Sequence, residues 1–227
     1  MPQRFQLADP AAEADLDTYL GRAAAAHDGP VRDASVRVIV AGAALAVYVP
    51  VLLPAGLLDD SATVLGLRVF GLREPGDEVD TIVPIAGLRD RLAAAAGGAF
   101  ELGAPTPVYA VSWAGIVPPR GGWTPIGEVD AAELRDSAIA GIEEVATAIP
   151  ARAGDPIVHG VRAHVWGAPL PGAERLPRGA ALAAHALGFL PPSGTETATI
   201  HEVGPWGRLT LRRGHVLVKR RAWSLAG

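Results

Sequence analysis

The sequence predicts an α+β fold: a mixed N-terminal half with a β-hairpin and helices, then a C-terminal half of about three helices followed by a small antiparallel sheet. Three observations predict it. The first half mixes helical and strand-like apolar patterns, three helical stripes ended by Pro or Gly follow, and the residues from Thr197 onward alternate apolar and polar side chains. With 227 residues, 49% of them hydrophobic, the chain can bury a sizeable core.

The predicted halves cover residues 1–110 and 126–227. A connection over 111–125 joins them, in a stretch from Gly103 to Pro125 that holds five prolines and four glycines in 23 residues. This composition excludes a long regular element, although Val108–Trp113 fits a short strand. Trp113 and Trp123 indicate a packed, ordered connection, because exposed tryptophan is unfavourable.

The N-terminal elements follow from periodicity and from residues that begin or end helices. Asp9 can cap a helix that begins at Pro10 and continues to about His27, since Leu16, Leu20 and Ala24 recur every four residues. Further on we expect a two-stranded hairpin, a buried strand and a second helix; these cover Ser35–Ala41 with Ala44–Leu52, Thr63–Leu72 and Pro84–Ala96.

One part of this region is long and apolar enough to be considered as a membrane span. Val38–Leu58 is a run of 21 uncharged residues. The hairpin interpretation is favoured because Gly42-Ala43 and two prolines interrupt the run. The N-terminus also lacks the pattern of a signal peptide. We therefore expect a cytoplasmic protein and no membrane partner.

In the C-terminal half, the helix Asp130–Ile149 has the clearest signature. Asp130 and Glu133 form a capping-box pattern, and the expected buried stripe is Leu134, Ala138, Ile142, Val145 and Ile149. A second helix runs from Asp155 to Trp166 with Ile157, Val161 and Val165 as its stripe. The remaining expected elements are a helix and three strands: Ala180–Leu190, Thr197–Val203, Trp206–Arg212 and His215–Arg220.

The last two strands form a basic hairpin. Residues 204–227 carry six of the 20 Lys and Arg residues and no Asp or Glu, whereas the chain as a whole has a net charge of −4. A turn at Arg213-Gly214 predicts that Arg208 lies opposite Lys219, that Arg212 lies opposite His215, and that this charged face points outward. The candidate residues for an anion or a partner are Arg208, Arg212, Arg213, His215, Lys219 and Arg220.

Three kinds of neighbour fit such a face: carboxylates of a protein, including a second copy of the chain, phosphates of nucleic acid, or a small anionic molecule. A protein partner or a homodimer is favoured because the rest of the chain is acidic. Helices followed by a basic hairpin match the order of a winged helix. However, Ala180–Leu190 offers no Arg, Lys, Asn or Gln to bases, and Arg178 beside it is a single contact.

A second candidate site is the loop formed by Arg120, Gly121, Gly122 and Trp123. The two glycines allow a close approach of a ligand, the arginine supplies a charge and the indole supplies a flat surface. The alternative is that Trp123 anchors a corner of the fold and the glycines form its turn.

Catalytic and metal chemistry have little support. The chain has no cysteine, its single lysine is in no nucleotide-binding motif, and no hydrolase, dinucleotide or zinc-protease motif occurs. His159 and His164 are five residues apart, which does not place them on one helix face, whereas His201 and His215 could meet across neighbouring strands. We expect no catalytic residue, metal or cofactor. An enzymatic function stays an alternative only through a Ser/His/Asp site that matches no known motif.

Three segments, Ser112–Pro125, Leu187–Leu190 and Arg213–Lys219, are similar to uncharacterised proteins of actinobacteria. The resemblance implies a bacterial protein of unassigned function and assigns no site residue. Taken together, the sequence favours a non-enzymatic protein-interaction or structural protein over a nucleic-acid-binding regulator or an enzyme.

Overall fold

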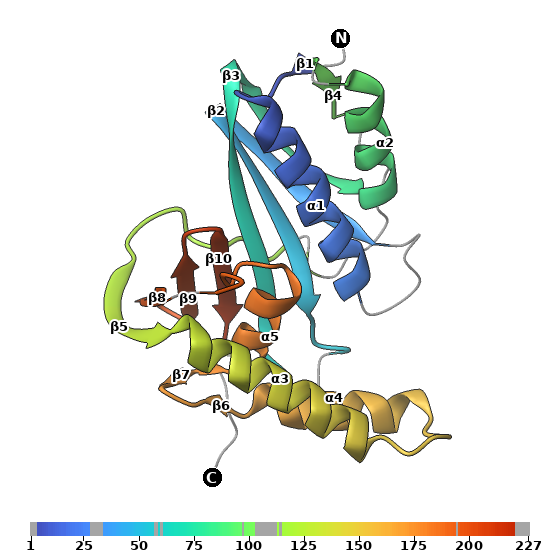
Figure 1. Cartoon of the computed structure of the whole chain (residues 1–227), viewed down its shortest axis with the longest axis vertical. Coiled ribbons are helices and arrows are strands. Elements are labelled where there is room, and N and C mark those ends of the chain that lie inside the picture. The colour runs from blue at the N-terminus through green and yellow to red at the C-terminus, as the bar shows by residue number, and fades with distance from the viewer. Residues whose placement is uncertain are drawn as a thin grey trace. The chain divides into compact units, whose positions relative to one another are not determined.

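A computed structural model of the chain (Figure 1) describes residues 4–27, 34–56, 59, 61–96, 98–102, 113, 115–193 and 195–220. It is 34% helical and 40% strand, which confirms the α+β class. The chain divides into two compact units: residues 1–51 with 67–117 form unit 1, and residues 52–66 with 118–227 form unit 2. In the described part of the chain, no helix is long and apolar enough to cross a membrane.

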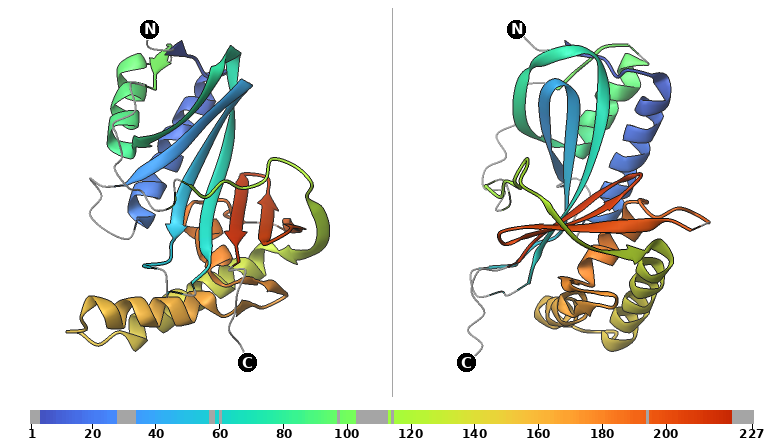
Figure 2. Two further views of the ribbon diagram at one scale, coloured as in Figure 1. Left: turned by 180° about the vertical axis from the view of Figure 1, so that it is seen from behind. Right: turned by 90° about the vertical axis from the view of Figure 1, so that its left-hand side faces the viewer.

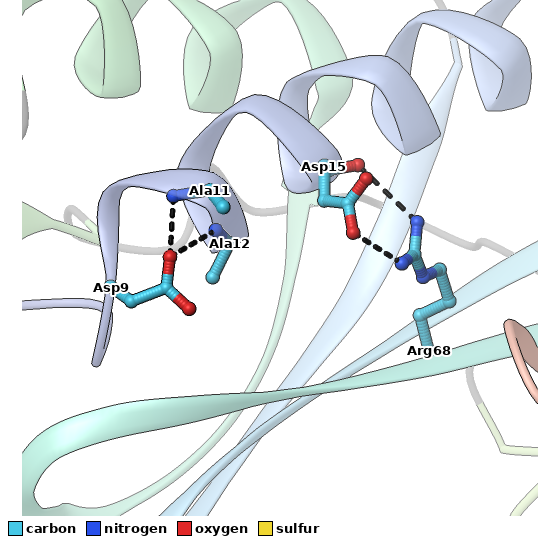
Figure 3. Close-up of polar contacts among 5 residues, drawn as sticks. All are labelled: Asp9, Ala11, Ala12, Asp15 and Arg68. Carbon is cyan, nitrogen blue, oxygen red and sulfur yellow. Dashed lines mark hydrogen bonds and ion pairs between the residues drawn. The ribbon is translucent and has the colours of Figure 1, made fainter.

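Unit 1 begins with the short strand β1 (Arg4–Phe5) and the predicted helix α1 (Pro10–Ala26). Asp9 caps α1, since its Oδ1 accepts hydrogen bonds from the backbone N–H groups of Ala11 and Ala12 at 2.5 and 3.2 Å (Figure 3). The helix buries four side chains on one face: Leu16, Tyr19, Leu20 and Ala23.

Two long strand elements follow, β2 (Ser35–Leu52) and β3 (Thr63–Pro84). The ribbon of β2 folds back on itself (Figure 2, right), and Gly42 in its exposed middle has a φ of 57°, as expected for the predicted turn at Gly42-Ala43. The prediction ended β3 at Leu72, too early. The helix α2 (Ile85–Ala95) agrees with the prediction, and β4 (Phe100–Glu101) pairs with β1.

Unit 2 contains the strands β10, β9, β8 and β5, which pair antiparallel in that order. The strands β8 (Thr197–Val203), β9 (Trp206–Leu211) and β10 (Gly214–Lys219) agree closely with the prediction. The sequence did not predict β5 (Thr124–Asp130), which pairs with β8, nor the small hairpin of β6 (Pro169–Leu170) and β7 (Ala173–Pro177). The predicted strand Val108–Trp113 lies outside the described residues, apart from Trp113.

Three helices complete unit 2, with corrections to each. In α3 (Ala131–Ala148), Asp130 makes no capping bond because its carboxylate accepts from the Thr197 hydroxyl, and the buried stripe is Ala131, Leu134, Ala138 and Gly141, which leaves Ile142 42% exposed. In α4 (Asp155–Gly167), Val165 and Trp166 are buried, whereas Ile157 is 54% exposed. α5 is shorter than predicted (Gly179–Ala186) and is followed by Gly188 at a φ of 72°.

Candidate functional site

The basic hairpin has a different turn from the predicted one. Leu211 lies opposite Gly214, so the two turn residues are Arg212 and Arg213, and the predicted pairing of Arg208 with Lys219 and of Arg212 with His215 is wrong. Packing explains the shift: a Cβ atom on Gly214 would stand 2.6 Å from the Phe189 ring. Glycine is therefore needed in the strand, where the backbone approaches an aromatic side chain, rather than in the turn.

Because the shift preserves the alternation of side chains, the same residues still share a face. Across β8, β9 and β10 this face holds three rows: Val203–Trp206–Lys219, His201–Arg208–Leu217 and Thr199–Thr210–His215. The opposite face carries Leu209, Leu211, Val216 and Val218, which are buried. The expectation of a fully outward charged face is wrong, since Trp206 and Leu217 on it are 5% and 2% exposed.

Arg208 is the centre of this face. Its guanidinium carbon lies 4.6 Å from the centroid of the Trp123 ring, and its Nε is buried with no hydrogen-bond partner. Within the described part of the chain, Arg208 forms no ion pair with a carboxylate. Its partial burial lowers its pKa, although an arginine remains charged at any physiological pH. Arg208 is thus a half-buried cation without an anion.

Two histidines flank Arg208. His201 lies directly opposite it on β8, and the Nδ1 of His201 is buried without a hydrogen-bond partner. On β10, His215 places its Nδ1 3.1 Å from the Thr210 hydroxyl oxygen. Burial, followed by the charge of Arg208, lowers the pKa of each histidine. We call Trp123, His201, Arg208 and His215 the Arg208 cluster.

The loop predicted as a second site contributes to this cluster. Gly122 has a φ of 80°, and the indole N–H of Trp123 donates to the Pro119 carbonyl at 3.1 Å, so the loop holds the ring in place. The anchored ring of Trp123 also lies against the charged side chain of Arg208, and binding of a ligand by this loop stays a prediction. Arg120 and Gly121 are exposed. No spacing in the sequence indicated that Trp123 and Arg208 would meet.

The other basic candidates have different surroundings. Arg220 pairs with Glu202 at 3.0 Å, and Glu202 also binds Arg175 at 2.7 Å. The ammonium group of Lys219 lies 5.9 Å from the ring of Trp206. Arg212 and Arg213 are exposed at the turn, where the backbone N–H of Arg212 donates to Glu196. The structure therefore separates Arg208 and His215 from the rest of the predicted set.

Two further features bear on chemistry. In unit 2, His159 on α4 bonds to Asp59 at 2.8 Å, and hydrogen bonds, including those from the Ala55 and Ser61 backbone, hold the pKa of Asp59 well below its usual range despite its burial. In unit 1, a groove of about 830 Å³ lies between α1 and α2 and is lined mainly by alanines and by the Asp17–Arg89 ion pair. Among the described residues, no group of three His, Asp or Glu side chains is placed to hold a metal ion.

Comparisons with known proteins identify two family matches. A family model described as "Domain of unknown function (DUF8010)" matches residues 1–115, and one described as "Domain of unknown function (DUF8185)" matches residues 118–223. No curated protein matches the chain.

Solved structures with a similar fold are DNA polymerase subunits. The DNA polymerase III subunit beta from Pseudomonas aeruginosa aligns with a TM-score of 0.50 at 14% identity, over 94% of this chain and 64% of that one. A DNA polymerase sliding clamp from Caulobacter crescentus aligns with a TM-score of 0.49 at 13% identity, over 100% and 67% of the two chains. The chain thus spans about two thirds of the length of these proteins, and at this identity the likeness is one of fold.

Proposed function

The chain belongs to the family described as "Domain of unknown function (DUF8010)", and we propose that it is a non-enzymatic interaction protein that binds an anionic group of a protein partner, or of a second copy of itself, at the Arg208 cluster. One observation carries the proposal. Arg208 is half buried, beside two histidines, and has no carboxylate partner among the described residues. An arginine in such a place recovers its lost hydration when an anion binds to it.

The cluster fits recognition of a protein better than recognition of a nucleic acid. A protein that follows a nucleic-acid backbone presents several exposed cations in a row. Here Arg220 is neutralised by Glu202, Lys219 is next to Trp206, and the whole chain has a net charge of −4. Arg212 and Arg213 at the turn are exposed. A single half-buried arginine with an aromatic neighbour is typical of a protein interface.

The fold is consistent with this role. The protein of similar fold from Pseudomonas aeruginosa is the subunit beta of DNA polymerase III, and a subunit is a component of a protein assembly. We propose that this chain likewise acts in an assembly, in the cytoplasm.

The test measures binding of a fluorescent deca-glutamate peptide at low salt, together with the mass of the protein by light scattering. We expect either the peptide or a second copy to bind, and Arg208→Gln to weaken this binding about tenfold, the loss of one charged hydrogen-bonded pair. Arg213→Gln, at the exposed turn, is the matched control and should have little effect.

A duplex DNA of 20 base pairs is the competing probe. Binding of DNA that weakens steeply with salt and depends on Arg212 and Arg213 would support a nucleic-acid-binding regulator instead. A monomer that binds neither peptide nor DNA would refute the proposal.

A further inference from the structure

The number of hydrogen-bond donors in the Arg208 cluster exceeds what a carboxylate needs. A carboxylate is satisfied by the fork of one arginine, which can donate two parallel N–H bonds. Here two imidazoles share the sheet face with that arginine, one directly opposite and one diagonal to it across β9 and β10. Residues in such positions have Cβ atoms within roughly 5 to 8 Å of each other. Three donor groups can therefore converge on one anion.

The hydrogen bond between His215 and Thr210 is compatible with this role. The Nδ1 of His215 is within hydrogen-bond distance of the Thr210 hydroxyl. When this hydroxyl donates to Nδ1, the proton of the neutral imidazole is on Nε2, which can then donate to a ligand. His201 has a buried Nδ1 with no partner, and Arg208 has a buried Nε with no partner. Buried polar atoms without partners are rare in native proteins, and a bound ligand is one of the causes. The two unsatisfied atoms come from neighbouring residues of one row.

Charge gives a second reason to expect a doubly charged anion. The charge of Arg208 acts on both histidines and favours their neutral forms. A carboxylate would only cancel that charge. A phosphomonoester carries about −1.5 to −2 at neutral pH and has three terminal oxygens, so it would both cancel the charge of Arg208 and favour the protonated imidazoles. The whole cluster then becomes complementary to the ligand.

The inference rests on the proposed function and names the group recognised. We propose that the Arg208 cluster binds a phosphomonoester, namely a phosphoserine or phosphothreonine side chain on the protein partner. Arg208 donates two bonds, His201 and His215 donate one each, and Trp123 holds the plane of the guanidinium. The charged groups on this face of strands β8, β9 and β10 are Arg208, His201, His215 and, one row away, Lys219. The neighbouring strand β5 adds two carboxylates to the same face, Glu128 opposite Thr199 and Asp130 opposite Thr197, and neither forms an ion pair with Arg208.

The test uses two fluorescent peptides that differ at one position, phosphoserine or glutamate, flanked by glycine and alanine, with the full chain at pH 6.5. We expect the phosphopeptide to bind at least ten times more tightly than the glutamate peptide. Arg208→Gln should weaken binding of both peptides by at least about tenfold, whereas His201→Gln with His215→Gln should remove only the advantage of the phosphopeptide. Calorimetry in buffers of different ionisation enthalpy should show proton uptake with the phosphopeptide alone.

The outcomes separate the two proposals. Equal, Arg208-dependent binding of the two peptides would overturn the phosphate assignment and leave the proposed function standing. Binding of neither peptide would overturn the phosphate assignment, and it would overturn the proposed function as well if light scattering shows a monomer. Inorganic phosphate that binds as tightly as the phosphopeptide would show that the site takes free phosphate rather than a residue of a partner. Duplex DNA that binds through Arg208 would assign the site to phosphodiesters. Arg213→Gln should change none of these values.

Discussion

Arg68 in unit 1 and Arg208 in unit 2 are both strand arginines that lie against aromatic rings, but of the two only Arg68 has a carboxylate partner among the described residues. The Arg68 guanidinium carbon is 5.1 Å from the Phe70 ring centroid and 5.9 Å from that of Tyr19, and its Nη2 bonds to Asp15 at 2.9 Å (Figure 3). Arg208 has the ring of Trp123 at 4.6 Å and two histidines nearby. An arginine beside aromatic rings is therefore paired with a carboxylate in unit 1, whereas in unit 2 no described carboxylate pairs with it.

The difference shows which arginine serves the fold. Asp15 is on α1, so the pair with Arg68 joins a helix to a strand within unit 1. Other arginines are also paired across elements, among them Arg37 with Asp80, Arg89 with Asp17 and Arg178 with Glu144. The half-buried Arg91 and Arg135 donate to backbone carbonyls instead. The buried Nε of Arg208, by contrast, has no hydrogen-bond partner among the described residues. An arginine that the fold leaves unpaired in a half-buried position is a candidate for binding.

The largest expected difference in the free energy of unfolding is that between the variants Arg68→Met and Arg208→Met. Arg68→Met should lower the free energy of unfolding by about 1–2 kcal/mol, because the ion pair and the contacts with two rings are lost. Arg208→Met should be neutral or stabilising within about 1 kcal/mol, since it removes a desolvated, unpaired charge. Urea unfolding of both variants measures the difference. Equal losses would show that Arg208 has a structural partner, and the comparison would fail.

A carboxylate placed beside Arg208 should form an ion pair with it and stabilise the fold, as Asp15 does with Arg68. His201→Glu puts an acid directly opposite Arg208 in the sheet. We expect the free energy of unfolding to rise by up to about 1 kcal/mol, the range of opposite-charge pairs across strands. The same variant should lose binding of the phosphopeptide, because its site is occupied by the new side chain. His201→Gln is the neutral control, and destabilisation by Glu but not by Gln would contradict the prediction.

A smaller effect is expected from pH. The pKa of His201 and of His215 is lowered in the folded chain, first by burial and then by Arg208, so the unfolded chain binds more protons as the pH falls below about 6.5, the usual value for histidine. Stability should therefore decrease from pH 7.5 to 5.5. Urea midpoints should fall less in the double variant His201→Gln, His215→Gln, and an identical fall in both proteins would contradict the assignment.

The sequence predicted elements with a single strong periodicity, and it failed where tertiary packing decides. Asp9 and Pro10 located the start of α1 because capping is local. The alternation in the hairpin gave the correct faces, whereas its register was missed because the ring of Phe189 requires Gly214 in the strand. Nothing in the sequence shows which residue fills the space beside a glycine.

The candidate site was predictable in part for the same reason. Arg208 and His215 follow from alternation, and their shared face with His201 follows from strand order. The contact with Trp123 depends on β5, whose first residues Thr124 and Pro125 belong to the predicted connection, because the sequence up to Pro125 is rich in proline and glycine. Its pairing with β8 is irregular between Pro125 and Gly127. The neutralisation of Arg220 by Glu202 depends on side-chain geometry that alternation does not contain.

The smallest expected change in the free energy of unfolding comes from removing the carboxylate partner of Arg68 in unit 1. Asp15→Asn removes the carboxylate of Arg68 but keeps its two rings and its 3.5 Å contact with the Asp15 backbone carbonyl. The Asp15 side chain is 62% exposed, so the loss in free energy of unfolding should be about 0.5 kcal/mol and should disappear in 1 M NaCl. The variant should not gain affinity for the phosphopeptide, because the contacts of Arg68 with the described residues are with Asp15, Tyr19 and Phe70 and include no histidine that could complete a second site. Binding that appears there would mean that an unpaired arginine beside an aromatic ring is sufficient, and that His201 and His215 are not what makes Arg208 selective.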